Sequence, residues 1–136
     1  MHSPVIPWER LECAAREVIV NCYAPYSRFK VGAALLTDQN DIVTGVNVEN
    51  ASYGLTNCAE RSAIFAAVSR GAKAIRAVVV FTPTTAPTSP CGACRQVLSE
   101  FGLAYPVRSI CLGEERLECT IGELLPHAMG ASNLSS

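Results

Sequence analysis

The chain has 136 residues, of which 49% are apolar and 17% charged, and its formal net charge is −1. This length predicts a single domain, residues 1–136, with a substantial core and with loose termini at 1–7 and 127–136. Acidic and basic residues are interspersed, which leaves no basic face for a nucleic-acid partner. No stretch approaches the roughly 18 apolar residues that cross a membrane, and the low charge favours burial of some surface in an oligomer.

Seven cysteines are an odd number, and the first residues lack the charged and apolar pattern of a signal peptide. We therefore expect a reduced, cytoplasmic protein whose cysteines bind a metal or fill the core. The four cysteines expected in the core are Cys13, Cys22, Cys111 and Cys119.

The first predicted elements are a helix and a hairpin. Apolar residues at helical spacing predict a surface helix over 8–22, which ends before Pro25. Residues 29–37 and 42–48 predict two strands, and the short turn between them makes the pair an antiparallel hairpin. Small residues at the centre of the first strand, beginning at Gly32, indicate close approach by a ligand or by another backbone.

A second helix and a buried strand follow. Asn57 predicts the N-cap of a helix over 58–70, and Gly71 its end. Residues 77–81 are continuously apolar, which is typical of a strand buried on both faces at the centre of a sheet. A third helix is predicted from 90 or 91 to 101.

The last predicted elements are two strands, 106–112 and 116–119, and a short helix over 120–125 that begins with a capping box. The link between these strands is too short for a helical crossover, so they should pair antiparallel. The whole order predicts an α/β fold, a three-layer α/β/α sandwich with a mixed five-stranded sheet.

Three cysteines lie where two of the predicted helices begin. Cys91 and Cys94 are at i and i+3 on one helix face, so both sulfurs can reach one ion, and Cys58 lies in the first turn of another helix. Helix N-terminal amides stabilise thiolates. Three protein ligands with a fourth position left for water are typical of a catalytic zinc site, so we expect one Zn²⁺ per chain.

Glu60 lies two residues after Cys58, close enough to take a proton from water at that site and pass it to a substrate nitrogen. Attack of water on an amidine-like carbon, followed by loss of ammonia, is a hydrolytic deamination. Cys-x-Glu with Pro-Cys-x-x-Cys is a known signature of zinc nucleobase deaminases. An isolated Asn57-x-x-Glu60 would more often be a capping pair, and a lone Cys-x-x-Cys a redox or structural zinc motif, but the combination favours an enzyme.

Two arginines, Arg61 and Arg95, directly follow the ligand groups. Three thiolates leave a net negative charge around a divalent ion. We therefore expect both arginines to donate hydrogen bonds to the sulfurs and restore some positive field.

Five motifs, in order, resemble those of the cytidine deaminases of the short, homotetrameric type, from about residue 11 to about residue 129. The motifs are Tyr26-Ser27-Arg28-Phe29 followed by Val31-Gly32-Ala33-Ala34-Leu35, Gly45-Val46-Asn47-Val48-Glu49-Asn50-Ala51-Ser52-Tyr53, Cys58-Ala59-Glu60-Arg61, Pro90-Cys91-Gly92-Ala93-Cys94-Arg95-Gln96-Val97 and Glu123-Leu124-Leu125-Pro126.

The resemblance implies hydrolytic deamination of cytidine and 2′-deoxycytidine to uridine and 2′-deoxyuridine plus ammonia, in pyrimidine salvage. It implies that Cys58, Cys91 and Cys94 bind the zinc ion and that Glu60 carries the proton.

For the substrate, the resemblance implies that Asn47 and Glu49 hold a ribose hydroxyl and that Phe29 packs on the pyrimidine ring. Backbone at Ala59 and Ser89 contacts the base. From the residues alone, Phe29 would be a core residue at a strand start, and Asn47 and Glu49 a polar strand end.

The resemblance also implies a homotetramer whose active sites are shared between subunits. Tyr53 would reach the site of a neighbouring subunit. Met129 stands where the family usually has an aromatic residue that stacks on the base in an adjacent subunit's pocket. Methionine can cover a ring, but without stacked geometry.

Three alternatives stay open: a deaminase of another free aminonucleoside, a deaminase of nucleic-acid bases, and a non-catalytic zinc-binding module. The absent basic face and the predicted antiparallel final strands count against nucleic acid. The sugar-binding pair, Asn47 and Glu49, favours a free ribonucleoside, and a binding module has no need of Glu60 beside an open zinc position.

Overall fold

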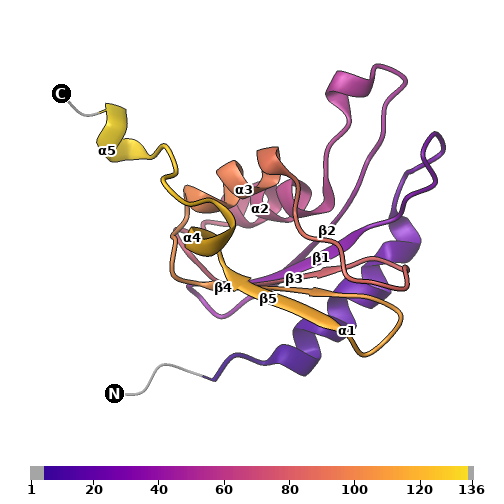
Figure 1. The fold of residues 1–136 in the computed structure, drawn as a ribbon, viewed down its shortest axis with the longest axis horizontal. Coiled ribbons are helices and arrows are strands. Elements are labelled where there is room, and N and C mark those ends of the chain that lie inside the picture. Colours follow the sequence, from indigo (N-terminus) through magenta and orange to yellow (C-terminus); the bar gives the residue numbers. More distant parts are fainter. Residues whose placement is uncertain (1–4, 135–136) are drawn as a thin grey trace.

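A computed structural model describes residues 5–134 and contains one mixed five-stranded sheet with helices on both faces (Figure 1). The strands are β1 (Gly32–Thr37), β2 (Ile42–Val46), β3 (Ile75–Phe81), β4 (Pro106–Ile110) and β5 (Arg116–Thr120), in the order β2-β1-β3-β4-β5. The helices are α1 (Trp8–Val18), α2 (Ala59–Ser69), α3 (Gly92–Ser99), α4 (Ile121–Leu124) and α5 (Ala131–Leu134), with 3₁₀ turns η1 (Ile19–Asn21) and η2 (Tyr53–Leu55). The predicted three-layer sandwich is confirmed.

The sheet topology follows the predicted pattern. β1 pairs antiparallel with both β2 and β3, β3 pairs parallel with β4, and β4 pairs antiparallel with β5. The continuously apolar strand β3 lies at the centre, as expected for a strand covered on both faces.

Side chains of alternating strand positions divide the core into two layers. On one face, Leu11 and Ala15 of α1 pack against a cluster that includes Leu36 of β1. On the other face, α2, α3 and α4 cover a larger cluster, to which β1 contributes Leu35. Successive residues of β1 point to opposite faces, so all six residues of this strand are buried.

Two predicted boundaries are wrong for the same reason, which is pairing with distant residues. Asn57 does not cap α2, because its backbone pairs with Val48 at 2.9 Å in both directions and stays extended, and Cys58 takes the N-cap position. The Asn57 side chain instead donates to the Ser62 hydroxyl. The first strand was predicted to begin at residue 29 but begins at Gly32. The side chain of Asn47 binds backbone N–H and C=O groups within residues 29–31, which therefore do not pair with a neighbouring strand.

The prediction of core cysteines holds for Cys111 only. Cys111 is buried, whereas Cys22 and Cys119 are half-buried and Cys13 is exposed. Cys13 lies two residues from Leu11, on the opposite side of α1 from the buried stripe.

The termini that were expected to be loose fall partly outside the described residues, at 1–4 and 135–136. Within the described part, α5 forms one helical turn at the end of an arm that projects from the body of the molecule (Figure 1). Among residues 5–134, no helix has the length and apolar character needed to cross a membrane.

Two glycines let helices lie directly on the sheet. A Cβ added to Gly32 would lie 2.2 Å from the carbonyl oxygen of Ala15 in α1. A Cβ at Gly45 would lie 2.4 Å from the nitrogen of Ala63 and 2.5 Å from the oxygen of Ala59 in α2. The close approach that was predicted around Gly32 is therefore an approach by helix backbone.

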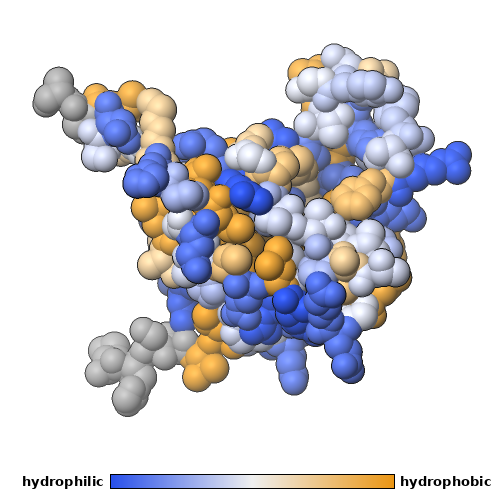
Figure 2. All heavy atoms as spheres, viewed as in Figure 1, coloured by the Kyte–Doolittle hydropathy of each residue, from blue (hydrophilic) through white to orange (hydrophobic). Residues whose placement is uncertain are grey.

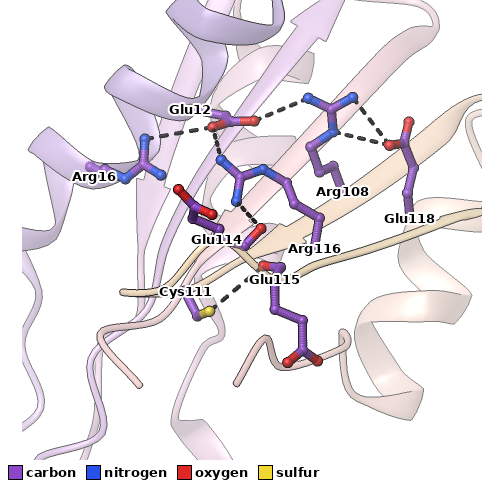
Figure 3. A network of polar contacts seen from close by, with 8 residues as sticks. All are labelled: Glu12, Arg16, Arg108, Cys111, Glu114, Glu115, Arg116 and Glu118. Carbon is purple, nitrogen blue, oxygen red and sulfur yellow. Dashed lines mark hydrogen bonds and ion pairs between the residues drawn. The ribbon is translucent and has the colours of Figure 1, made fainter. Parts of the chain in front are cut away.

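An ionic network ties α1 to the far strands of the sheet (Figure 3). Glu12 is only 8% exposed, and its two oxygens accept hydrogen bonds from Arg108 at 3.0 Å and Arg116 at 2.9 Å. Arg108 also pairs with Glu118 and lies over the ring of Trp8, 3.8 Å from its centre. Burial alone would raise the pKa of Glu12, but the hydrogen bonds and charges of the two arginines outweigh it and lower that pKa.

We expect Gly45→Ala to lower the free energy of unfolding by about 1–3 kcal/mol, because the added methyl group overlaps the backbone of α2. Urea denaturation at one fixed protein concentration measures the change. Gly54→Ala is the matched control, since a Cβ there meets nothing within 4 Å. Equal stability of the two variants would contradict the direct packing of α2 on β2.

We expect Glu12→Gln to lower the free energy of unfolding at pH 7 by about 1.5–3 kcal/mol, the range for hydrogen bonds to charged groups. The folded-state pKa of Glu12 lies below its ordinary value of 4.5. The carboxylate therefore stabilises the fold above about pH 4.5, and this contribution is lost as the pH falls through the folded-state pKa.

Denaturation of wild type and Glu12→Gln from pH 7 to pH 3.5 tests this sign. The stability difference between the two proteins should be constant at neutral pH and should shrink below about pH 4.5. A difference that grows on acidification would show that Glu12 is not held as a carboxylate by its arginines.

Candidate metal centre and active site

Three cysteine thiols meet where α2 and α3 begin. Cys58 and Cys91 are the extended residues directly before α2 and α3, and Cys94 lies in the first turn of α3. The Sγ atoms of Cys58 and Cys91 are 3.8 Å apart, those of Cys91 and Cys94 are 3.3 Å apart, and all three lie within 4.8 Å of one another. Sulfurs about 2.3 Å from a tetrahedral zinc ion would be about 3.8 Å apart, so this cluster fits one zinc ion.

Hydrogen bonding between two of the thiols shifts their pKa values in opposite directions. Hydrogen bonding from Cys94, helped by Arg61, lowers the pKa of Cys58 to about 5. The same bond with Cys58, together with burial, raises the pKa of Cys94. The first thiolate therefore forms easily at Cys58, and a cation is needed to hold all three sulfurs deprotonated.

Arg61 contacts one of the three sulfurs. Its Nη2 donates to Sγ of Cys58 at 3.1 Å. Its Nε is buried and has no hydrogen-bond partner among the described residues. The guanidinium therefore places positive charge directly behind the sulfurs.

The expected bonds from Arg95 to the sulfurs are not formed, because all three of its nitrogens bind oxygens. Nε donates to the carbonyl of Pro90 at 2.8 Å, Nη2 to the hydroxyl of Ser89 at 2.8 Å and Nη1 to the carbonyl of Leu124 at 2.9 Å. Arg95 thus fixes the segment before Cys91 and links it to α4.

Glu60 lies in the first turn of α2 and is only 4% exposed. Burial, with a smaller effect from the Cys58 thiolate, raises the pKa of Glu60 to about 7. A carboxyl with such a pKa can both accept and donate a proton near neutral pH. The capping-box interpretation is wrong, because Asn57 is not the N-cap of this helix.

A cavity of about 240 Å³ opens beside the thiol cluster. Its lining includes eight residues that the sequence had pointed to: Phe29, Asn47, Glu49, Cys58, Ala59, Glu60, Ser89 and Cys91. It also includes seven that had been assigned no part in the site: Ser27, Val31, Thr56, Asn57, Val80, Thr82 and Thr88. Most of these lie within or next to a recognised motif, and that position was the available signal.

Asn47 is buried at the end of β2 and holds the segment that carries Phe29. Its Oδ1 accepts the N–H of Val31 at 3.0 Å, and its Nδ2 donates to the carbonyl of Phe29 at 2.7 Å. The Phe29 side chain is 43% exposed and lines the cavity, so the interpretation as a core residue is wrong.

Glu49 holds the start of the same segment. One carboxylate oxygen accepts the N–H groups of Tyr26 at 2.9 Å and of Ser27 at 3.1 Å, and the other accepts the Ser27 hydroxyl. These bonds, the Ser27 hydroxyl foremost, lower the pKa of Glu49. The polar segment that follows β2 therefore forms part of one wall of the cavity.

Neither Tyr53 nor Met129 lines the catalytic cavity of its own chain. Tyr53 is 78% exposed, and its ring meets that of Tyr26 edge-on, with centres 6.3 Å apart. It lines an adjoining cavity of about 410 Å³ with Ser27 and Glu49. Met129 is 56% exposed, and its carbonyl accepts a hydrogen bond from the side chain of Gln96.

Comparison with known proteins identifies the same family as the sequence motifs, over almost the whole chain. Residues 9–108 match the family described as the cytidine and deoxycytidylate deaminase zinc-binding region. A cytidine deaminase of Sporosarcina psychrophila is 44% identical over 128 residues, which cover 93% of this chain and 94% of the relative. A cytidine deaminase of Mycobacterium tuberculosis is 42% identical over 136 residues, which cover 96% of each chain.

A solved structure agrees as well. The crystal structure of cytidine deaminase from Burkholderia pseudomallei superimposes with a TM-score of 0.87 at 43% identity, covering 91% of this chain and 100% of that one. The matched region contains the three thiols that fit one zinc ion. This chain therefore belongs to the family of zinc-dependent cytidine deaminases.

Proposed function

We propose that this chain deaminates free cytidine and 2′-deoxycytidine hydrolytically, giving uridine or 2′-deoxyuridine and ammonia, as a step of pyrimidine salvage. Membership of the family supports the reaction. The observation that carries it in this chain is the buried carboxyl of Glu60, which lines the same cavity as Cys58 and Cys91 of the zinc site.

The proton balance of the reaction gives Glu60 its role. Bound zinc supplies a Lewis acid that makes water nucleophilic near neutral pH. As the water oxygen bonds to C4 of the base, Glu60 takes one water proton and delivers it to ring nitrogen N3. It then moves the second proton to the exocyclic amine, the C4–N bond breaks, and ammonia leaves.

The cavity wall suits a free nucleoside. We assign the sugar hydroxyl contacts to Asn47 and Glu49 and the base-facing contact to Phe29, all of which line the cavity. Backbone at Ala59 and Ser89 would contact the base. Asn47 keeps one amide hydrogen beyond the one that binds Phe29, so it can still donate to a ligand.

The other functions have less support. A deaminase of another free aminonucleoside would use the same metal centre. Only a comparison of the rates with different nucleosides separates that function from cytidine deamination. A nucleic-acid partner is disfavoured by the net charge of −1 and by the direct antiparallel pairing of β4 and β5. A non-catalytic zinc module does not account for the burial of Glu60 beside the cavity.

We further propose a homotetramer in a reduced, cytoplasmic setting. All seven cysteines are free. Apolar side chains are exposed on the outer face of α2, at Phe65 and Val68, and on η2, at Leu55. Apolar surface also lies around α4 and on the projecting α5 (Figure 2). Association would bury these surfaces and would bring Tyr53 and Met129 to the sites of neighbouring subunits.

We expect Glu60→Gln to lower kcat for cytidine by about 10²–10⁴-fold, because an amide cannot carry the proton. Zinc should stay at one ion per chain. The rate is measured from the change in absorbance as cytidine becomes uridine, and zinc by atomic absorption. Glu9→Gln is the control, since it removes one exposed carboxylate far from the cavity.

Zinc-loaded wild type that leaves cytidine unchanged would contradict the proposed function. A Glu60→Gln variant that keeps its zinc and turns over at the wild-type rate would reject Glu60 alone as the proton carrier.

We expect Met129→Phe to keep kcat and to lower KM for cytidine by about twofold to fivefold, because an aromatic ring can stack on the base. The comparison is made by steady-state kinetics on the assembled protein. Leu134→Phe, a similar change at an exposed residue of α5, should leave KM unaltered. An unaltered KM in Met129→Phe would place Met129 outside a neighbouring pocket, and a large loss of activity would contradict stacking of the new ring on the base.

A further inference from the structure

The segment 26–31, which carries Phe29 into the cavity, is bound by Asn47 and Glu49 and also by one hydroxyl group of its own. Oγ of Ser27 accepts the N–H of Phe29 at 3.0 Å and donates a hydrogen bond to Oε2 of Glu49. Ser27 and Glu49 both line the catalytic cavity. A single side chain therefore joins the aromatic residue of the wall to its carboxylate.

The local backbone needs this hydroxyl. Arg28 has a φ of +59°, in the left-handed region that residues with side chains seldom adopt. The chain reverses tightly there, and the bond from Phe29 N–H to Ser27 Oγ is the side-chain bond of a serine turn. The turn is thus stabilised by Ser27 and by a backbone bond from Arg28 to Ala24.

The Glu49 carboxylate has one hydrogen-bond acceptor position left for a ligand. A carboxylate has about four acceptor positions, two on each oxygen. The N–H groups of Tyr26 and Ser27 use both positions on Oε1, and the Ser27 hydroxyl uses one on Oε2. The remaining position lies on Oε2, beside Ser27. The three bonds keep Glu49 ionised at neutral pH, so it can only accept a hydrogen bond from a ligand.

We propose that Ser27 is a positioning residue for sugar recognition, whose hydroxyl fixes Glu49 so that the free acceptor position of Oε2 receives the 3′-hydroxyl of the nucleoside. The inference rests on the proposed function and extends it. The 3′-hydroxyl is the ring hydroxyl that cytidine and 2′-deoxycytidine share, so one arrangement serves both substrates. Ser27 acts through Glu49 and does not take part in the chemistry at the base.

A cycle of two enzymes and two substrates tests the proposal. Wild type and Ser27→Ala are compared with 2′-deoxycytidine and with 2′,3′-dideoxycytidine, which differ only in the 3′-hydroxyl. For 2′-deoxycytidine, Ser27→Ala should raise KM by about tenfold with little change in kcat, the size expected for a displaced bond to a charged group. For 2′,3′-dideoxycytidine the same variant should lose less than about threefold in kcat/KM.

Two further variants make the result specific. Ser27→Thr keeps the hydroxyl and should restore most of the wild-type KM. Ser99→Ala removes a hydroxyl that donates to the carbonyl of Gln96, outside the cavity lining, and should keep wild-type kinetics. If Ser27→Ala fails to fold, Ser27→Gly removes the same hydroxyl and enters the same cycle.

Equal losses for the two nucleosides, or a Ser27→Ala enzyme with wild-type KM, would overturn the proposal. The wild-type rate with cytidine is measured first and tests the proposed function alone. A failure of the deamination itself is therefore distinguishable from a failure of the role of Ser27.

Discussion

The direct contact between the backbone of α2 and β2 at Gly45 is the constraint on which the site depends. Because Gly45 has no side chain, the first turn of α2 lies against the strand, with backbone atoms of Ala59 and Ala63 at the place of a missing Cβ. This turn carries Glu60, and the segment directly after β2 carries Asn47 and Glu49. One packing contact therefore sets the distance between Glu60 and the two polar residues of the cavity wall.

Two carboxyl groups of this cavity have opposite pKa shifts, and the surroundings of each explain why. Glu60 is buried without a cationic partner that outweighs burial, so its pKa rises to about 7. Glu49 receives one hydroxyl and two N–H bonds, so its pKa falls. The first environment suits a group that exchanges protons, and the second suits a fixed acceptor. The same residue type thus serves two purposes a short distance apart.

Sequence periodicity was sufficient for the elements and the sheet, because it depends on local burial. The apolar run 77–81 placed β3 at the centre, and the short link after β4 made the last pair antiparallel. The spacing of Cys91 and Cys94 is local as well, whereas their meeting with Cys58 was predicted from the ligand pattern of a catalytic zinc site. The errors at Asn57 and at residues 29–31 came from bonds to Val48 and Asn47, which no local pattern specifies.

Arg61 and Arg95 both follow zinc-ligand motifs in the sequence, but their side chains bind different groups. Arg61 lies three residues after Cys58, on the same face, and its Nη2 reaches the sulfur. Arg95 lies four residues after Cys91, a spacing that also allows contact, but its side chain donates to oxygens of Pro90, Ser89 and Leu124. The oxygen acceptors around each arginine, and not spacing alone, therefore determine which of the two binds a sulfur. Arg95 stabilises the centre from outside, by fixing the backbone from which α3 begins.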